Sequence, residues 1–356
     1  ARASAVELAD GKLTVSGFGE WGYGRTTNEN AYLVGEEDGG YDNAQFALAL
    51  TARPQEDVVV AGQLFAARGG EVSLDWAFAE YRLDDLLRIR VGKVKNPLGL
   101  FMEVKDVGTL RPFFTLPQSI YGPGEFAAEA YQGVGVTGEW EHASGWGVGY
   151  DAYAGALEIP KAEPAEVVLA VPVPTPADPW DFSGLREEEE AKGVFGGRVS
   201  LTTPIDGLTA RLSAFTGELS PEDGGEEERL AVFGLSAEYA TERLQVRGEF
   251  FRGTEGDAET NLGGYAEVAW SFQRNLQVAL RFDESHQHVD GLPADDRFLG
   301  HHEAAVGVSY WPSPNLVFKA SYHNVDGNRF AVPALSQDGT LDRTTHLFVA
   351  GAQFSF

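Results

Sequence analysis

Apolar and polar residues alternate along most of the chain with a period of two, which is typical of β-strands that have one apolar and one polar face. In one such segment, Arg88 and Arg90 alternate with leucine, isoleucine and valine. In another, Trp76 and Phe78 are predicted to lie on the apolar face, opposite Asp75. About sixteen segments of this kind follow one another to the last residue, each about as long as a strand that crosses a bilayer.

The connections between these segments alternate between short and long. The short ones lie at residues 53–57, 83–86, 142–144, 204–207, 241–243, 273–275 and 311–315. The long ones lie at residues 24–43, 96–130, 158–193, 218–228, 284–300 and 325–343. Short turns at one rim and long loops at the other are typical of an outer-membrane barrel. The predicted fold class is therefore all-β: a closed antiparallel transmembrane β-barrel of about 16 strands, with short periplasmic turns and long extracellular loops, forming a single domain over residues 1–356.

Residues 96–130 stand apart because they lack the alternation and yet carry many large apolar side chains. A long loop without regular structure is usually functional or disordered, and this composition argues against disorder. Burying each Phe, Leu or Ile gains about 1.5–3 kcal/mol, which a loop lying over the outer mouth would forgo. We therefore expect residues 96–125 to enter the lumen and set its narrowest point. The loop at 158–193, rich in Pro, Glu and Ala, is expected to be extracellular.

Composition narrows the classes of function. The net charge of −27 argues against nucleic-acid binding. No apolar run approaches the roughly 18 residues of a membrane helix, and a mean hydropathy of −0.22 is compatible with a barrel that shows lipid only every second residue. The chain has no Cys, which fits export through an oxidising periplasm. Its first residues look like a mature N-terminus left by signal cleavage.

Enzymatic and metal-binding signals are weak in this sequence. No G-x-S-x-G, H-E-x-x-H or P-loop sequence is present, so we expect no enzyme, with an outer-membrane barrel enzyme as a distant alternative. No catalytic residue, dedicated metal ligand or cofactor is expected, although the acidic loops can bind Ca²⁺ or Mg²⁺ weakly. His286, His288, His301 and His302 are close in sequence, but adjacent surface histidines are usually only solvated.

The last strand, AGAQFSF, ends on Phe356. A terminal strand of this kind resembles those of bacterial outer-membrane porins, and VGKVKNPLGLF…RPFFTLPQSIY is similar to a segment of some proteobacterial porin-like proteins. The resemblance implies a sixteen-stranded homotrimer in the bacterial outer membrane, surrounded by lipid and lipopolysaccharide, that passes small hydrophilic solutes and ions by passive diffusion. It implies that Phe356 belongs to the signal read by the barrel-assembly machinery. It also implies that residues 96–130 are the third loop, although that loop lacks a PEFGG-type signature.

Charged side chains in mid-strand are expected to face the lumen, because Arg or Lys facing lipid at mid-depth costs about 2–4 kcal/mol. The wall candidates for the pore are Arg88, Arg90, Lys93, Lys95, Glu139, Arg211, Arg247 and Arg281. The candidates from the inward segment are Glu103, Lys105, Asp106 and Arg111. Lys93 and Lys95 lie near a strand end and break the alternation, so a bulge or a snorkelling side chain is an alternative for them.

One interpretation places a basic wall opposite an acidic loop. Arg88 and Arg90 would then face Glu103 and Asp106 across the aperture, and the transverse field would favour small polar solutes. The acidic net charge predicts a weak cation preference at low ionic strength, which fades as salt screens the exposed carboxylates.

Other interpretations stay open. Lys105 and Arg111 can line the aperture, or they can pin the loop to carboxylates of the wall. The two wall arginines can also continue through Lys93 and Lys95 as a basic ladder, which would suit a channel selective for anions or organic acids. A purely structural barrel with a closed lumen is a further alternative.

Overall fold

The structure is a computed structural model of the 356-residue chain. It describes residues 5–27, 30–31, 35–36, 39–41, 44–66, 72–122, 125–126, 128–160, 188–219, 227–257, 259–291, 293, 297, 299–330, 332–333 and 342–356.

Sixteen long strands form a closed barrel in which each strand pairs antiparallel with its neighbours. The first eight are β2 (Leu13–Thr26), β5 (Ala44–Gln55), β6 (Val58–Ala66), β7 (Val72–Arg82), β8 (Arg88–Lys95), β9 (Ala130–Glu141), β10 (Gly147–Pro160) and β11 (Glu188–Thr202). The other eight are β12 (Leu208–Leu219), β13 (Glu228–Ala240), β14 (Leu244–Glu255), β15 (Glu259–Gln273), β16 (Leu276–Val289), β17 (Gly300–Ser313), β18 (Leu316–Asp326) and β20 (Thr344–Ser355).

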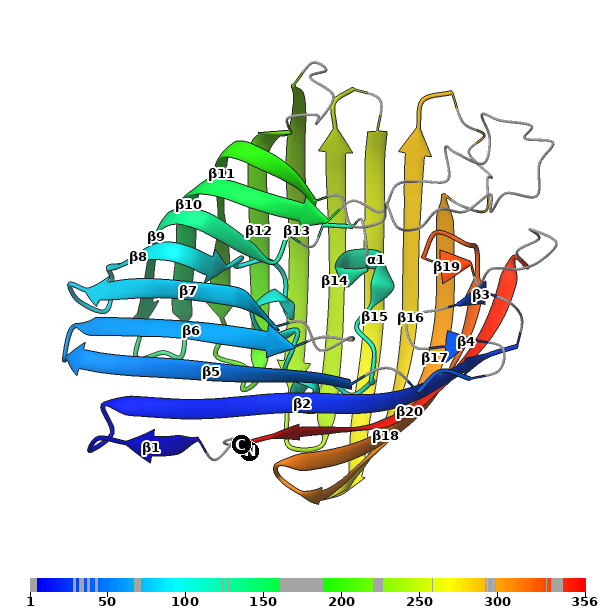
Figure 1. Ribbon diagram of the computed structural model, residues 1–356, viewed down its shortest axis with the longest axis horizontal. Coiled ribbons are helices and arrows are strands. Elements are labelled where there is room, and N and C mark those ends of the chain that lie inside the picture. The colour runs from blue at the N-terminus through cyan, green and yellow to red at the C-terminus, as the bar shows by residue number, and fades with distance from the viewer. Residues whose placement is uncertain are drawn as a thin grey trace.

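The last strand closes the barrel onto the first. β20 pairs with β18 along one edge and with β2 along the other. The Phe356 N–H donates to the Gly17 carbonyl at 2.8 Å, and the Gly17 N–H donates to the Phe356 carbonyl at 3.0 Å. The short β1 (Val6–Leu8) pairs with β2, and the end of β20 lies close to β1 (Figure 1). A closed ring leaves no free sheet edge, which is what a bilayer requires.

The alternation in the sequence becomes an apolar outer surface and a largely polar lumen. In β14, Val246 and Phe250 are exposed outside the barrel, whereas Arg247 and Glu249 are buried inside it. Aromatic residues exposed on the outside include Trp21, Trp140, Trp146, Trp270, Phe272 and Tyr310. An apolar outer surface of this kind is what a transmembrane β-barrel presents to lipid.

The predicted face of two aromatic residues in β7 is wrong. Asp75 is an extra residue in this strand, and the pairing with β6 slips by one between Leu74 and Trp76. Such a bulge shifts the alternation by one residue, so Trp76 and Phe78 turn towards the lumen. Their rings lie 5.7 Å apart, and the Arg90 guanidinium lies 5.6 Å from the centre of the Phe78 ring.

The connection after β10 is shorter than expected. Residues 158–160 belong to β10 and residues 188–193 to β11, because the ladder between these strands continues to Pro160 opposite Glu188. The rest of that predicted loop, 161–187, lies outside the described residues, as does 220–226 of the next acidic loop. Weak Ca²⁺ or Mg²⁺ binding at these loops stays a prediction.

The few helical turns among the described residues all lie between β8 and β9. They are the 3₁₀ turns Met102–Val104 and Gly108–Leu110 and the single α-turn α1 (Gln118–Tyr121). None of the described helices is long and apolar enough to span a bilayer. Short pairings also occur outside the long strands, between β3 (Asn30–Ala31) and β19 (Val332–Pro333) and between β4 (Gly35–Glu36) and β2.

Candidate functional site

The segment between β8 and β9 runs inside the barrel, where its side chains meet residues of the inner wall. α1 lies against β14, β15 and β16 (Figure 1). Met102 and Ile120 are fully buried although they belong to a connecting segment. Two different kinds of contact hold the segment in place, one apolar and one polar.

The first kind is a hydrophobic core inside the barrel, which we call the apolar seat. From the segment it contains Leu98, Leu100, Phe101, Met102, Ile120, Phe126 and Ala128. From the walls it contains Val94, Tyr131, Tyr153, Leu157, Ala191, Val194, Phe215, Leu219, Leu230, Val232, Phe251 and Tyr265. The Phe101 ring lies 5.8 Å from that of Tyr121 and 6.5 Å from that of Tyr265. Because burial of each large apolar side chain gains about 1.5–3 kcal/mol, this core fixes both the beginning and the end of the segment against β8–β15.

Glu249 of β14 is a polar anchor within the apolar seat. Its Oε1 accepts the Leu100 N–H at 2.8 Å and the Ser236 hydroxyl at 2.6 Å. Its Oε2 accepts the hydroxyls of Tyr121 at 2.6 Å and Tyr265 at 2.8 Å. Burial and the Glu249 charge raise the pKa of Tyr121 well above its ordinary value, so this hydroxyl remains a donor. A buried carboxylate with four donors is a satisfied one.

The second kind of contact, which we call the polar seat, holds residues 108–119 through side chains of β16–β20 and β2. These side chains are Arg281, Asp283, Ser309, Lys319, Gln353 and Glu20. Lys319 donates to the carbonyls of Gly108 at 2.7 Å, Arg111 at 2.5 Å and Phe113 at 3.1 Å. An ammonium group has three hydrogens, so this buried lysine has an acceptor for each.

Neighbouring strands extend the polar seat. Arg281 donates to the carbonyl oxygen of Thr115 at 3.0 Å and to its hydroxyl at 3.1 Å, and it forms an ion pair with Glu303 at 2.8 Å. The Ser309 hydroxyl donates to the Pro112 carbonyl at 2.8 Å. The segment is therefore held by its backbone as much as by its side chains.

Arg111 links the segment to β2. Its guanidinium lies 3.2 Å from Glu20, whose carboxylate also accepts the Gln353 amide at 2.6 Å. Burial lowers the pKa of Arg111, against the opposing effect of Glu20. Of the two interpretations open for Arg111, the geometry favours pinning of the segment to a wall carboxylate.

A cluster of charges ties the start of the segment to its end. Lys95 lies 3.2 Å from Asp75 and 2.9 Å from Asp106, and it also binds Glu129. Lys105 binds the other oxygen of Glu129. Burial alone would raise the pKa of Glu129, but Lys105 and Lys95 outweigh it and lower that pKa to about 2. We call this group the lysine clamp.

The two wall arginines are bound to neighbouring carboxylates. Arg90 lies 2.7 Å from Glu80 and 3.9 Å from Asp151, and Arg88 binds Glu139. The side chain of Glu139 is 61% exposed, so the pair that includes Arg88 is largely solvated. Neither arginine contacts the acidic residues of the inward segment among the ion pairs of the described residues.

Those acidic residues have other partners. Glu103 pairs with Arg198 of β11 at 2.5 Å, and Arg198 also binds Asp151 at 2.9 Å. Asp106 belongs to the lysine clamp. The loop carboxylates thus make direct ion pairs, whereas the sequence suggested that they would face Arg88 and Arg90 across an open aperture.

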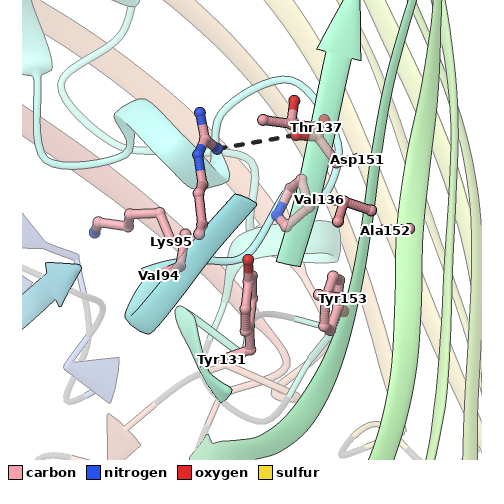
Figure 2. Close-up of a pocket in the computed structure, with 10 residues that line it drawn as sticks. Val94, Lys95, Tyr131, Val136, Thr137, Asp151, Ala152 and Tyr153 are labelled. Carbon is pink, nitrogen blue, oxygen red and sulfur yellow. Dashed lines mark ion pairs between the residues drawn. The ribbon is translucent and has the colours of Figure 1, made fainter. Parts of the chain in front are cut away.

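A small pocket lies where β8–β10 meet the start of the segment. Its lining residues are Arg90, Val94, Lys95, Pro97, Tyr131, Val136, Thr137, Asp151, Ala152 and Tyr153. The rings of Tyr131 and Tyr153 stack at 4.3 Å with an interplanar angle of 9° (Figure 2). The pocket therefore has one aromatic side and one charged side.

Lys93 departs from the expectation that it lines the pore. It lies opposite Gln132 of β9, on the face that carries the exposed Val91 and Val134. Its amine lies 3.4 Å from Glu158, which also accepts the Gln132 amide at 2.6 Å. Lys93 is thus on the outer face near the end of β8, where a long side chain can reach a polar partner. The basic ladder is broken at this position.

Arg211 and Arg247 both touch the segment from the wall. Arg211 donates to the Gly99 carbonyl at 3.0 Å. Arg247 lies 3.2 Å from Glu238 and 3.5 Å from Glu267, and its guanidinium is 5.2 Å from the centre of the Phe101 ring. Both residues stabilise the apolar seat at its polar edge.

Comparison with known proteins identifies the fold. No family model matches the sequence, and no curated protein matches it. Solved structures do match: the outer-membrane channel DcaP of Acinetobacter baumannii has a TM-score of 0.60 at 8% identity, covering 97% of both chains. An anion-selective porin from Comamonas acidovorans has a TM-score of 0.59 at 10% identity, covering 97% of this chain and 99% of that one. The trimer form of OmpT, an outer-membrane protein of Vibrio cholerae, has a TM-score of 0.57 at 10% identity with the same coverage. The fold is that of the sixteen-stranded outer-membrane porins.

Proposed function

We propose that this protein is a passive channel of the bacterial outer membrane for small hydrophilic solutes and ions, narrowed by residues 96–125. The observation that carries the proposal is a connecting segment fixed inside the barrel by both an apolar and a polar seat. Charged residues of the wall and of the segment lie side by side there, as in the pair of Arg198 and Glu103. The shared fold supports a channel in general.

Single-channel recording of the purified protein in planar bilayers tests this function. We expect discrete conductance steps in potassium chloride, and slower permeation by larger uncharged sugars. A correctly folded barrel without conductance would instead favour the structural alternative with a closed lumen.

Ion preference separates the general channel from the anion-selective alternative. We expect weak cation preference at low ionic strength because the net charge is −27, and we expect it to fade with salt because exposed charges are screened within about 8 Å at physiological ionic strength. The reversal potential in a salt gradient measures this. Anion preference at every salt concentration would favour the alternative, for which the outward Lys93 is unfavourable.

The expected assembly is a homotrimer embedded in outer-membrane lipid and lipopolysaccharide. The trimer form of the Vibrio cholerae protein supports this state, and its measurement is the molecular mass in mild detergent. Phe356, which is hydrogen-bonded to β2 at the barrel seam, is the residue that we expect the barrel-assembly machinery to read.

The absence of enzymatic activity is also part of the proposal. Ser321 and His323 lie 2.8 Å apart, and His323 lies 3.1 Å from Glu303, which is the order of a Ser–His–carboxylate triad. However, His323 is fully buried beside Phe113, and Arg281 binds the same Glu303 oxygen. A substrate has no access to this chain of groups, so we interpret it as part of the wall.

A further inference from the structure

Three side chains that can bind metals converge inside the wall beneath α1. His301 Nε2 lies 3.9 Å from Asp283 Oδ2 and 4.0 Å from Glu303 Oε2, and the three donor atoms all lie within 4.8 Å of one another. The three residues are 0–2% exposed. We propose that Asp283, His301 and Glu303 form a buried site for one divalent transition-metal ion of the Zn²⁺ class. This proposal does not depend on the channel function.

The surrounding residues orient Glu303 for this role. Its Oε1 is bound by Arg281 at 2.8 Å and by His323 Nδ1 at 3.1 Å. The other oxygen, Oε2, is the one that approaches His301. Metal ligands are typically fixed by hydrogen bonds to outer groups in this way, so the carboxylate is already turned towards the site.

Asp283 is fixed by the segment itself. The Gln118 N–H donates to its Oδ2 at 2.6 Å, and the Ser119 N–H is shared between Oδ1 at 3.3 Å and Oδ2 at 3.5 Å. A carboxylate offers about four lone-pair positions, so these two donors leave the carboxylate able to bind an ion. The His301 ring is held edge-on to Phe330 at 4.9 Å. A bound ion would therefore link Asp283 of β16, which holds α1, to His301 and Glu303 of β17.

A second cluster of three possible ligand residues in the lumen differs from this site, because a lysine ammonium already occupies it. In the lysine clamp, Asp75, Asp106 and Glu129 also bring three donor atoms within 4.8 Å. There the Lys95 ammonium contacts all three carboxylates, so positive charge is already supplied. In the wall site the arginine contacts Glu303 on the oxygen that faces away from His301, and the third donor is an imidazole nitrogen in place of a carboxylate oxygen.

The donor set selects the kind of ion. One imidazole nitrogen with two carboxylate oxygens suits Zn²⁺ and neighbouring transition metals, whereas Ca²⁺ and Mg²⁺ prefer oxygen ligands alone. Donors at about 2.0–2.2 Å from Zn²⁺ are about 3.5 Å apart in a tetrahedron. The observed spacings are slightly wider, so binding requires the three side chains to move inward by about half an ångström. Because the site is buried, we expect slow exchange and retention of the ion through gel filtration.

The test uses the full-length protein, refolded into detergent from metal-free denaturant with Zn²⁺ and then passed through gel filtration in EDTA. Retained metal is measured by mass spectrometry. His301→Ala is compared with His302→Ala, which removes the adjacent histidine on the outer face of the same strand. We expect one retained Zn²⁺ per chain in the wild type and in His302→Ala, and at least a tenfold loss in His301→Ala. We also expect Zn²⁺ to raise the melting temperature of the first two proteins only.

Two measurements guard against a variant that fails to fold. Barrel formation is checked by heat-modifiable gel migration, and Glu303→Gln provides a second ligand variant. The wild type with Co²⁺ should show visible absorption typical of nitrogen and oxygen ligands. Equal retention of Zn²⁺ in His301→Ala, loss of Zn²⁺ in His302→Ala, or a wild type that retains none would each overturn the proposal.

Discussion

The apolar seat and the polar seat hold two parts of one segment by different physical means. On the β8–β15 side, Phe101 and Met102 enter a hydrophobic core with one satisfied carboxylate, Glu249. On the β16–β20 side, Lys319 and Arg281 bind mainly backbone oxygens of the segment. The apolar side gains free energy from burial in any geometry that excludes water. The polar side is stable only when each buried donor has its acceptor.

This difference assigns different tasks to the two sides. Apolar contacts are non-directional, so the apolar seat supplies most of the free energy that keeps the segment inside the barrel. Hydrogen bonds are directional, so the polar seat fixes the path of residues 108–119. We therefore expect damage to the apolar seat to lower stability, and damage to the polar seat to alter the channel.

Removal of residues 100–118 eliminates nearly all of the stretch held by the polar seat, together with Leu100, Phe101 and Met102 of the apolar seat, and should have the largest effect. We expect single-channel conductance to rise roughly two- to threefold and discrimination by solute size to weaken, because we propose that the segment forms the narrowest point of the path. Circular dichroism and heat-modifiable migration verify the barrel. Unchanged conductance in a folded deletion variant would place the constriction elsewhere, in the 158–193 region first.

Phe101→Ala tests the apolar seat alone. The side chain is 4% exposed, and truncation of a buried Phe typically costs about 3–5 kcal/mol. We expect a decrease of this order in the free energy of unfolding by urea, with little change in ion preference. Phe250→Ala is the matched control, because Phe250 is 49% exposed on the outer face. Equal losses in the two variants would show that no special core exists in the lumen.

Lys319→Met tests the polar seat alone. The carbonyls of Gly108, Arg111 and Phe113 lose their donor. We expect this loss to lower the free energy of unfolding by about 2–3 kcal/mol. The segment should then adopt several positions, visible as increased current fluctuations in the open channel. Lys93→Met, on the outer face, should leave both quantities unchanged. A quiet, wild-type-like current in Lys319→Met would refute the assignment of the path to the polar seat.

The lysine clamp predicts a smaller, pH-dependent effect. The pKa of Glu129 is lowered from 4.5 to about 2, so its ionised form stabilises the folded clamp above pH 4.5, and this contribution is lost as the pH falls towards 2. Because the Glu129 side chain is 31% exposed, we expect its ionised form to contribute only about 1–2 kcal/mol to the free energy of unfolding. Pepsin cleavage within residues 96–130, divided at each pH by the cleavage rate of an unfolded reference peptide, should increase as the pH falls over this range.

Glu129→Gln is the control for the clamp, since it cannot titrate. It should show a loosened segment already at pH 5 and no further change in normalised pepsin sensitivity attributable to this position at lower pH. Equal resistance of the wild type at pH 5 and pH 2.5 would contradict the prediction.

The fold could be predicted because its signals are local. Alternation and turn length are properties of short stretches, and together they determine strand number and the two rims. The failure in β7 has a physical cause: one extra residue, Asp75, reverses the faces of Trp76 and Phe78, and nothing in the local pattern marks it. The prediction that Lys93 lines the pore also relied on the local pattern. It did not hold, because a charged residue at a strand end can lie outside the barrel, and Lys93 lies there beside Glu158.

The site could be predicted only in its apolar half. The large apolar side chains of Phe101, Met102 and Ile120 predict burial from residue type alone, and all three are buried in the structure. The polar half left no comparable signal, because Lys319 binds backbone carbonyls, which every residue carries. Its acceptors lie 206–211 positions away along the chain. Alternation places Lys319 in the lumen, but only the three-dimensional path of the segment reveals what it holds.

The seam between β2 and β20 imposes an order of events on the folding chain. Gly17 and Phe356 are hydrogen-bonded to each other, so the ring is complete only after β20 has paired with β2 as far as Phe356. Arg111 binds Glu20 on one side of this seam, and the Phe114 carbonyl accepts the Gln353 amide on the other at 3.4 Å. The segment therefore contacts both β2 and β20, and it is positioned to bring these strands together before or while they pair. A contact between β2 and β20, such as that of Glu20 with Gln353 at a separation of 333 positions, is slow to form by chance, so the inward segment can serve as the template on which the barrel closes.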